Sequence, residues 1–217
     1  MIKACIFDLD GTLADTIWDI AEACNRALTG MGFEARPPRK IQSYFGKGIA
    51  KVLERCLPEE DRSEEIAQRL AERMHRYYAE HLLDKTVLFP GIGETVTQLR
   101  ALGVPLYVVT NKPHEQAVPI IHGLFGKNAF VKISGIGPDV PRKPDPKETL
   151  RCVHESGFQP EKVVMIGDSP GDMRTAKNAG IVAAGVAWGY FPPEVLMDAG
   201  ADLILNAPQD IVDMIER

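Results

Sequence analysis

The sequence is poor in cysteine and contains no long apolar run. Its four cysteines are far apart and none forms a C-x-x-C pair, so the sequence supports neither a zinc site nor a dithiol redox motif. We expect the four cysteines to be small apolar residues of the core, in a protein of a reducing compartment. No segment approaches the roughly 18 apolar residues of a membrane span, and the N-terminus shows no signal-peptide pattern. These absences predict a cytoplasmic protein.

The sequence also has fewer basic than acidic residues. The chain has 25 lysine and arginine residues against 30 aspartate and glutamate residues, which gives a formal net charge of −5. Nucleic-acid binding needs a basic stripe and a membrane-surface anchor needs a basic run, and the sequence has neither. We therefore expect a small-molecule partner, with no nucleic acid and no membrane. The sequence leaves a monomer and a homodimer open.

Short β-rich segments alternate with helix-forming segments along most of the chain. Helix-forming segments such as 146–156 and 172–179 separate most of the β-rich ones. This alternation predicts an α/β fold with a doubly wound parallel sheet that carries helices on both faces. The expected strands are residues 3–7, 105–109, 130–134, 163–166, 182–186 and 203–205.

A long helical stretch separates the first expected strand from all the others. Residues 46–83 are charged and helix-forming, with almost no strand signal. A lone N-terminal strand is not stable by itself, so the simplest architecture is one sheet interrupted near its start. We expect residues 1–15 and 87–217 to form an α/β core domain, and residues 16–86 to form an inserted all-helical domain. Two independent domains are the alternative.

Polar residues follow three of the expected strands. Because the carboxyl ends of parallel strands meet at one edge of a sheet, ligands bind in the crevice beyond that edge. A further polar element, residues 142–146, contains Lys143 and precedes a helix. The strand-end residues are Asp8, Asp10 and Thr12 after the first strand, Thr110 and Asn111 after the second, and Asp168 and Asp172 after residues 163–166.

The acidic members of this set predict a metal site. Asp8 and Asp10 are two residues apart and share a direction in extended backbone, and Asp168 would join them from another strand. Three carboxylates repel one another unless a cation lies among them. Oxygen ligands select a hard ion, Mg²⁺ above all, which pairs naturally with a substrate phosphate.

Donors for such a phosphate are also present. Thr110, the amides near Asn111 and the Lys143 ammonium would supply hydrogen bonds to phosphoryl oxygens. Taken one at a time, these features have simpler explanations: a turn with solvated carboxylates, a helix cap and a surface lysine. Taken together, these polar residues each lie at a strand end or in a loop, and that shared placement favours a phosphate site.

These motifs resemble those of the haloacid dehalogenase (HAD) superfamily, in the branch with a helical cap inserted after the first motif. Residues 8–12, D-L-D-G-T, match the family's D-x-D-G-T motif. Thr110, Lys143 and residues 167–172, G-D-S-P-G-D, match the second, third and fourth motifs in order. The resemblance covers essentially the whole chain and implies a Rossmann-like core with residues 16–86 as the cap.

The resemblance also implies a role for each matched residue. Asp8 would be the nucleophile, forming an aspartyl-phosphate, and a metal ligand. Asp10 would act as general acid and then general base, with its backbone carbonyl on the metal, and Thr12 would orient the loop. Thr110 and Lys143 would hold the phosphoryl group. Asp168 would be the third protein ligand of Mg²⁺, with Asp172 supporting the water shell of the ion.

Asp10 and two loop segments indicate the subclass. Family members that cleave carbon–halogen bonds lack this second aspartate, so its presence favours a phosphatase, while a phosphosugar mutase stays open. Lys47, in the F-G-K-G segment between expected cap helices, would bind an anionic substrate group or would be an ordinary turn lysine. Residues 110–113 and 185–190 resemble phosphoglycolate phosphatases, with features shared by pyrophosphatases and nucleotidases. The first substrate candidate is 2-phosphoglycolate.

A non-enzymatic module is the rival from another class. Signalling receiver modules are also α/β and are phosphorylated on aspartate, but they are shorter, lack an inserted helical stretch and carry the acceptor on a later strand. A relative that has lost catalysis is the second rival. The combined presence of Asp8, Asp10, Lys143 and Asp168 argues against that second rival.

Overall fold

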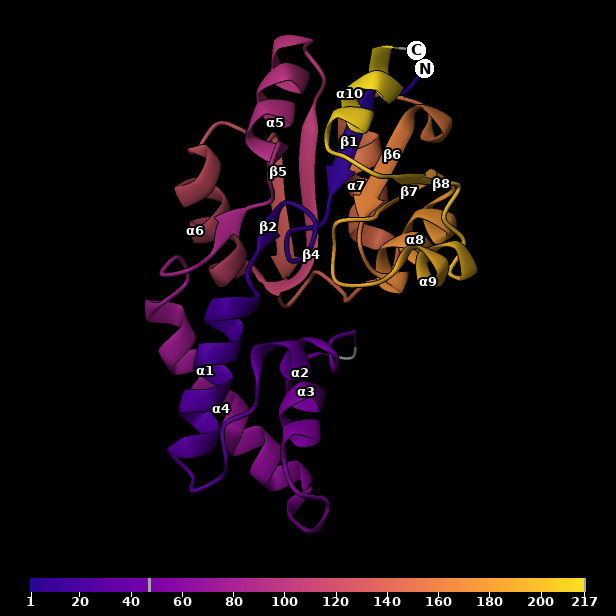
Figure 1. Cartoon of the computed structure of the whole chain (residues 1–217). Helices are drawn as coiled ribbons and strands as arrows, with labels where there is room; N and C mark the ends of the chain where they lie inside the picture. Colours follow the sequence, from indigo (N-terminus) through magenta and orange to yellow (C-terminus); the bar gives the residue numbers. More distant parts are fainter. Residues whose placement is uncertain (47, 217) are drawn as a thin grey trace. The chain divides into compact units, whose positions relative to one another are not determined.

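The chain forms two compact units (Figure 1). The structure, a computed structural model, describes residues 1–46 and 48–216. One unit comprises Met1–Asp15 and Val87–Arg217 and is called the core unit here; the other, Thr16–Thr86, is called the helical unit. Within the described ranges, every helix is too short or too polar to cross a bilayer.

The core unit is built on a six-stranded parallel sheet in the order β5-β4-β1-β6-β7-β8. From β1 the chain adds β4 and β5 on one side, and then β6, β7 and β8 on the other. Strand order therefore reverses beside β1, which is where open α/β sheets bind ligands. The strands are β1 Ala4–Phe7, β4 Leu106–Pro113, β5 Lys132–Ile136, β6 Val163–Gly167, β7 Val182–Val186 and β8 Leu203–Leu205.

The predicted α/β fold is confirmed, and the largest shifts in strand bounds are in β4 and β5. β4 runs four residues beyond the expected end at Val109, because the chain continues through an irregular pairing with β5. β5 begins at Lys132, two residues later than expected. A short antiparallel pair, β2 (Ala14–Asp15) with β3 (Val87–Leu88), also belongs to the core unit.

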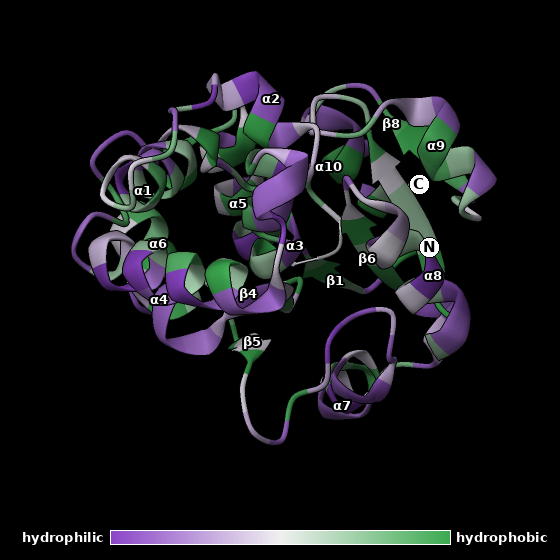
Figure 2. Cartoon of the chain, turned by 90° about the horizontal axis from the view of Figure 1, so that it is seen from below, coloured by the Kyte–Doolittle hydropathy of each residue, from purple (hydrophilic) through white to green (hydrophobic). Residues whose placement is uncertain are grey.

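Helices cover both faces of the sheet, since every residue of β1 and β6 is buried. In Figure 2 these two strands are green, the colour of hydrophobic residues, whereas α7 is largely purple. α5 packs against α10, and α7 packs against α8. The helices are α5 Ile92–Ala101, α6 His114–Phe125, α7 Lys147–Ser156, α8 Pro170–Ala179, α9 Pro193–Asp198 and α10 Gln209–Glu216, with a 3₁₀ turn at Pro160–Lys162.

The helical unit has a hydrophobic core of its own. Residues such as Leu28, Leu53 and Leu70 are fully buried between its helices. Asp19 joins the two ends of the unit, because its Oδ2 accepts hydrogen bonds from Thr86 N and Thr86 Oγ1, both at 2.8 Å. The helices are α1 Ile17–Thr29, α2 Pro38–Gln42, α3 Ile49–Cys56 and α4 Glu64–Glu80, with a 3₁₀ turn at Glu59–Asp61.

Candidate active site

Asp8 follows directly after β1, at the carboxyl edge of the sheet. Its backbone N–H donates to Ile166 O of β6 at 2.9 Å, which continues the parallel ladder by one residue. Its side-chain Oδ1 accepts from Leu9 N at 2.7 Å. The carboxylate is buried, so it needs polar partners to stay charged.

Lys143 supplies a positive partner for this carboxylate. Its Nζ lies 3.0 Å from Asp8 Oδ1 and 2.5 Å from Asp172 Oδ1, and it donates to Val109 O at 3.0 Å. These three acceptors match the three protons of an ammonium group. Burial alone would lower the pKa of Lys143, but Asp172 and Asp8 outweigh it and raise that pKa above its ordinary value. Lys143 is therefore a fixed cation.

Three buried carboxylates meet in this place. Asp8, Asp168 and Asp172 each offer an oxygen atom, and these atoms all lie within 4.8 Å of one another. Asp168, at the end of β6, accepts from Thr12 Oγ1 at 3.1 Å and from Tyr190 N at 2.8 Å. The structure thus brings together residues that are more than 150 positions apart in the sequence.

The charges of the cluster do not balance. Burial, followed by Asp172 and Asp10, raises the pKa of Asp8 to about 7 against the lowering effect of Lys143. Burial and the carboxylates of Asp8 and Asp172 raise the pKa of Asp168 well above its ordinary value. Crowded oxygen ligands with one lysine among them fit a hard divalent cation, which would keep all three carboxylates ionised.

Asp172 is held by the first turn of α8. Its Oδ2 accepts from Ser169 N at 3.0 Å and from Ser169 Oγ at 2.6 Å, and its own N–H donates to Ser169 Oγ, which forms a capping box. Gly167 leaves room for it, because a Cβ there would lie 2.3 Å from Asp172 Cγ. The family resemblance implies that Asp172 supports the water shell of the ion, which stays a prediction, and the structure pairs Asp172 with Lys143.

The end of β4 contributes three consecutive polar residues. Thr110 is buried, and its Oγ1 accepts from Lys112 N at 3.2 Å, which leaves its hydroxyl proton available for donation. Asn111 pairs with the backbone of Lys143: Oδ1 accepts from Lys143 N at 2.8 Å, and Nδ2 donates to Lys143 O at 3.4 Å. Lys112 Nζ lies 2.9 Å from Asp10 Oδ1.

Comparison with known proteins decides the family. The model of the haloacid dehalogenase-like hydrolase family matches residues 5–186. The chain belongs to this family. The expectation of a hydrolase of the HAD type is thereby confirmed.

Two curated relatives and one solved structure match this HAD-like hydrolase over nearly their whole length. It is 38% identical to the phosphoglycolate phosphatase of Chromobacterium violaceum over 100% of this chain and 97% of that protein. It is 32% identical to the phosphoglycolate phosphatase of Aquifex aeolicus over 100% of this chain and 98% of that protein. A crystal structure of a candidate phosphoglycolate phosphatase from Lactobacillus delbrueckii subsp. bulgaricus superposes with a TM-score of 0.89 at 32% identity, covering 98% of both chains.

Glycines around Asp168 let the loops of this HAD-like hydrolase close on the cluster. Gly11 has φ +82°, and a Cβ there would lie 2.2 Å from Asp168 Oδ2. A Cβ on Gly189 would lie 2.1 Å from Asp168 Cβ. Any side chain at either position would collide with Asp168, so the glycine of D-x-D-G-T has a steric reason to be there.

Sequence reasoning missed the specific contacts of two residues at the site of this HAD-like hydrolase. The sequence assigns no role to Lys112, and it does not show that the Asn111 side chain holds the backbone of Lys143. The expectation that amides near Asn111 donate to a phosphate stays a prediction. A lysine two positions after a polar strand end was the available signal for Lys112. Lys47, a predicted substrate-binding residue, lies outside the described residues.

Residues after β7 also reach this edge of the sheet. Trp188 Nε1 donates to Thr12 O at 3.0 Å, and Tyr190 OH donates to Asp15 Oδ1 at 3.1 Å. Thr12 therefore connects the aspartate loop with both Asp168 and the segment after β7. This arrangement agrees with the predicted role of Thr12 in orienting the loop, which stays a prediction.

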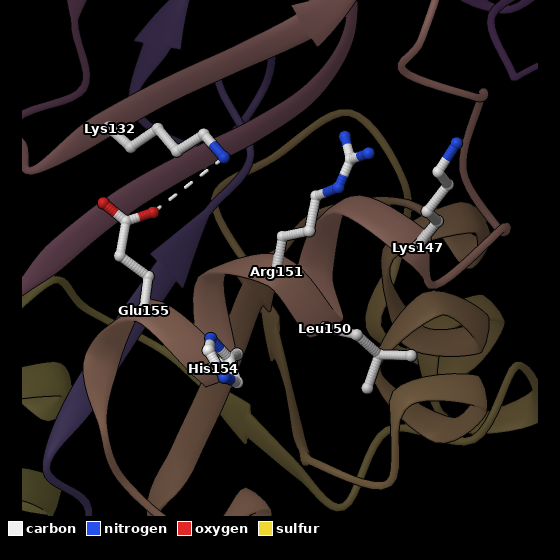
Figure 3. Close-up of a pocket in the computed structure, with 6 residues that line it drawn as sticks. All are labelled: Lys132, Lys147, Leu150, Arg151, His154 and Glu155. Carbon is white, nitrogen blue, oxygen red and sulfur yellow. Dashed lines mark ion pairs between the residues drawn. The ribbon is translucent and has the colours of Figure 1, made fainter.

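A surface cavity of about 640 Å³ lies elsewhere on the core unit, on α7 (Figure 3). Two of its cations are paired with carboxylates: Lys132 and Arg151 lie 2.8 and 2.9 Å from Glu148, and Lys132 also lies 3.9 Å from Glu155. The cavity contains none of the aspartate cluster, so the hydrolase chemistry is assigned to the carboxyl edge of the sheet. It is lined by Lys132, Lys147, Leu150, Arg151, His154 and Glu155.

Proposed function

We propose that this chain is a magnesium-dependent phosphatase that hydrolyses small phosphate monoesters through a phosphorylated Asp8. One observation carries the proposal: Asp8 lies in a buried cluster with Lys143, Asp168 and Asp172 at the point where the strand order reverses. A structural ion pair needs one carboxylate for one lysine, whereas this cluster has two carboxylates in excess. A dication with a phosphate beside it would balance that excess.

In the first half of the reaction, Asp8 attacks the phosphorus atom. An Asp8 oxygen forms a bond to phosphorus, and the bond from phosphorus to the leaving oxygen breaks. Mg²⁺, which Asp8 and Asp168 would hold, would supply positive charge that keeps Asp8 ionised and offsets the charge of the phosphoryl oxygens. Lys143 holds Asp8 in place, and Lys143 and the Thr110 hydroxyl donate to the phosphoryl oxygens.

In the proposed reaction, Asp10 acts as general acid in the first half and as general base in the second. In its protonated form it gives a proton to the leaving oxygen, so the alcohol departs neutral. The resulting Asp10 carboxylate then accepts a proton from the water that attacks phosphorus. This second step releases inorganic phosphate and restores the Asp8 carboxylate.

The substrate we propose is 2-phosphoglycolate. The support is that the relatives quoted above are named phosphoglycolate phosphatases and align over nearly the whole chain. Segments 110–113 and 185–190, which motivate the same candidate from sequence, lie at the carboxyl ends of β4 and β7. Mutase, pyrophosphatase and nucleotidase activities are outcomes of the substrate test below.

The first experiment measures phosphate release from 2-phosphoglycolate in the presence of Mg²⁺. We expect turnover that EDTA abolishes and excess Mg²⁺ restores. Asp8→Asn should lower kcat by at least about 10³-fold, because an amide cannot form the phosphoenzyme. Asp213→Asn, an exposed aspartate of α10, is the matched control and should keep normal turnover. Near-normal activity of Asp8→Asn would remove Asp8 as the nucleophile.

The same assay then ranks substrates by kcat/KM. The panel contains 2-phosphoglycolate, hexose phosphates, pyrophosphate and nucleoside monophosphates. We expect the highest kcat/KM for 2-phosphoglycolate. A higher value for another compound would replace the substrate and leave the phosphatase proposal intact, whereas isomerisation of a hexose phosphate without phosphate release would indicate a mutase.

A further inference from the structure

The pairing of β4 with β5 is irregular where β4 reaches the site. Val109 pairs with Ser134, and the next pairing joins Pro113 to Ile136. Four residue steps on β4 therefore match two on β5, and two extra residues bulge out of the ladder. Bulges of this kind occur next to active sites, where they redirect a side chain.

Gly135 on β5 makes room for this bulge. A Cβ at Gly135 would lie 2.6 Å from Lys112 O and 2.7 Å from His114 Cα. Both are backbone atoms, so they could not move aside as the end of a flexible side chain can. The irregular path of β4 at Lys112 is thus matched by a glycine on its neighbour.

The bulge presents Lys112 to Asp10. Lys112 Nζ lies 2.9 Å from Asp10 Oδ1 and 3.2 Å from Asp10 Oδ2, so one ammonium contacts both carboxylate oxygens. Its side chain is 3% exposed, whereas that of Asp10 is 23% exposed. The backbone of Lys112 is fixed in turn, since its N–H donates to Thr110 Oγ1.

Packing alone does not explain an ammonium in this position. Burying a charge is costly, and an apolar side chain of similar volume is often as stable as a buried ion pair. A need to hold the Asp10 carboxylate in one orientation would account for a lysine here, since its Nζ contacts both carboxylate oxygens. Proton transfer imposes that need, because a misplacement of about 1 Å can cost about 10²-fold in rate.

We propose that Lys112 is a positioning residue that orients the Asp10 side chain, both as the carboxylic acid that gives a proton to the leaving oxygen and as the carboxylate that takes one from the attacking water. This inference rests on the proposed function, since it takes Asp10 as the acid and base. Contact with both oxygens restricts rotation of the carboxylate. Lys112 keeps its own protons throughout, and the protons pass between Asp10 and the leaving oxygen or the water.

The test compares two aryl phosphates of similar shape in the presence of Mg²⁺. Phenyl phosphate has a poor leaving group that needs a proton, whereas 4-nitrophenyl phosphate leaves readily without one. The parameter is kcat/KM, which covers the steps up to the first cleavage at phosphorus. For Lys112→Met we expect kcat/KM to fall about 10- to 100-fold for phenyl phosphate, and less than about threefold for 4-nitrophenyl phosphate.

Two further variants separate positioning from a structural role. Lys132→Met, on the neighbouring strand β5, removes another lysine that pairs with a buried carboxylate, and it should leave the ratio of the two substrates unchanged. Lys112→Arg restores a cation with several donors and should recover most of the phenyl phosphate rate. In the Asp10→Asn background, Lys112→Met should have no further effect on kcat/KM, because the two residues act as one unit.

Three outcomes would overturn the inference. The first is an equal fall in kcat/KM for both aryl phosphates, and the second is a rise in KM at constant kcat. The third is that the effects of Lys112→Met and Asp10→Asn on kcat/KM are additive. If Lys112→Met fails to fold, as judged by circular dichroism, Lys112→Gln takes its place with the same expected ratio. Failure of the proposed function would look different: Asp8→Asn would stay active or EDTA would have no effect, whatever Lys112 does.

Discussion

Lys143 and Asp8 form a contact that several further hydrogen bonds constrain. Lys143 Nζ contacts Asp8, Asp172 and the Val109 carbonyl, and Asn111 binds both the backbone N–H and the backbone carbonyl of Lys143. Such a lysine cannot rotate away as a surface lysine does. In the proposed reaction, this fixed orientation would lower the reorganisation needed at Lys143.

Replacement of Asp10 should separate the two halves of the reaction. An amide in Asp10→Asn can neither donate a proton as an acid nor accept one as a base. With 4-nitrophenyl phosphate, whose leaving group needs no proton, Asp8 should still be phosphorylated while its hydrolysis slows by about 10²-fold or more. Intact-mass spectrometry after rapid quenching should show a gain of one phosphoryl group.

The control for this trapping experiment is the double variant Asp8→Asn/Asp10→Asn. It should show no mass gain, because the acceptor oxygen is missing. A mass gain in the double variant would place the phosphoryl group on another residue. Absence of the species in Asp10→Asn at every quench time would contradict the two-step scheme.

At the scale of elements, the edge of the sheet is assembled by strand ends, a bulge and one helix start. Asp8 and Asp168 directly follow β1 and β6, and the first turn of α8 orients Asp172. β5 does not enter the site, but Gly135 shapes the neighbouring β4. The link between β5 and α7 is ionic, through Glu148, which is buried against Lys132.

Glu148 should make the stability of the core unit depend on pH. Its carboxylate accepts from Ser134 Oγ at 2.7 Å and pairs with Lys132 and Arg151. Burial would raise the pKa of Glu148, but these hydrogen bonds and ion pairs outweigh it and hold the pKa below its ordinary 4.5. A lowered pKa in the folded state means stabilisation that is fully present above pH 4.5 and is lost as the pH falls through the folded pKa.

We therefore expect Glu148→Gln to lower the free energy of unfolding by about 1–3 kcal/mol at neutral pH. The difference from wild type should shrink below pH 4.5, where the carboxylate of the wild type becomes protonated. Urea denaturation at a series of pH values measures this. Glu161→Gln, on the exposed 3₁₀ turn, is the control and should show no such dependence. A difference that stays constant with pH would contradict this account.

At the scale of the whole molecule, each of the two units has its own hydrophobic core and its own tryptophan. The two tryptophans of the chain are Trp18 in α1 and Trp188 in the loop after β7. Trp188 donates to the Thr12 carbonyl, beside the aspartate cluster, whereas Trp18 is 46% exposed. A Trp18→Phe variant therefore gives a fluorescence signal from the core unit alone.

Mg²⁺ should stabilise the core unit by relieving the repulsion among its carboxylates. Binding to the folded state at a concentration of 100 times Kd contributes about 2.7 kcal/mol. For a chain of this size, each kcal/mol of added stability raises Tm by about 2–4 °C. We expect the Trp188 melting transition of Trp18→Phe to move upward with Mg²⁺.

The matching variant for this measurement is Asp168→Asn in the Trp18→Phe background. It removes one ligand and one of the repelling charges, so the Mg²⁺-dependent shift should be lost or greatly reduced. Its stability without Mg²⁺ should be equal to or above that of its parent. A full shift in the variant would mean that Mg²⁺ binds elsewhere.

Residue order alone determined the class of fold and the main candidates for the site. An apolar strand that ends in D-x-D-G-T and the alternation of β-rich and helical segments are local patterns, and they predict the parallel sheet and its functional edge. Asp8, Asp168 and Lys143 could be selected in advance because their motifs lie at strand ends or in a loop. Their roles in the reaction stay predictions.

Only the tertiary structure decided which side chains meet. The contact between Lys112 and Asp10 spans 102 positions, and that between Asn111 and Lys143 spans 32. Both depend on the order of the strands and on the register shift between β4 and β5, which no local pattern records. Hydrophobic periodicity reports which face of an element is buried, but the pairing of buried charges is set by packing between elements distant in the sequence.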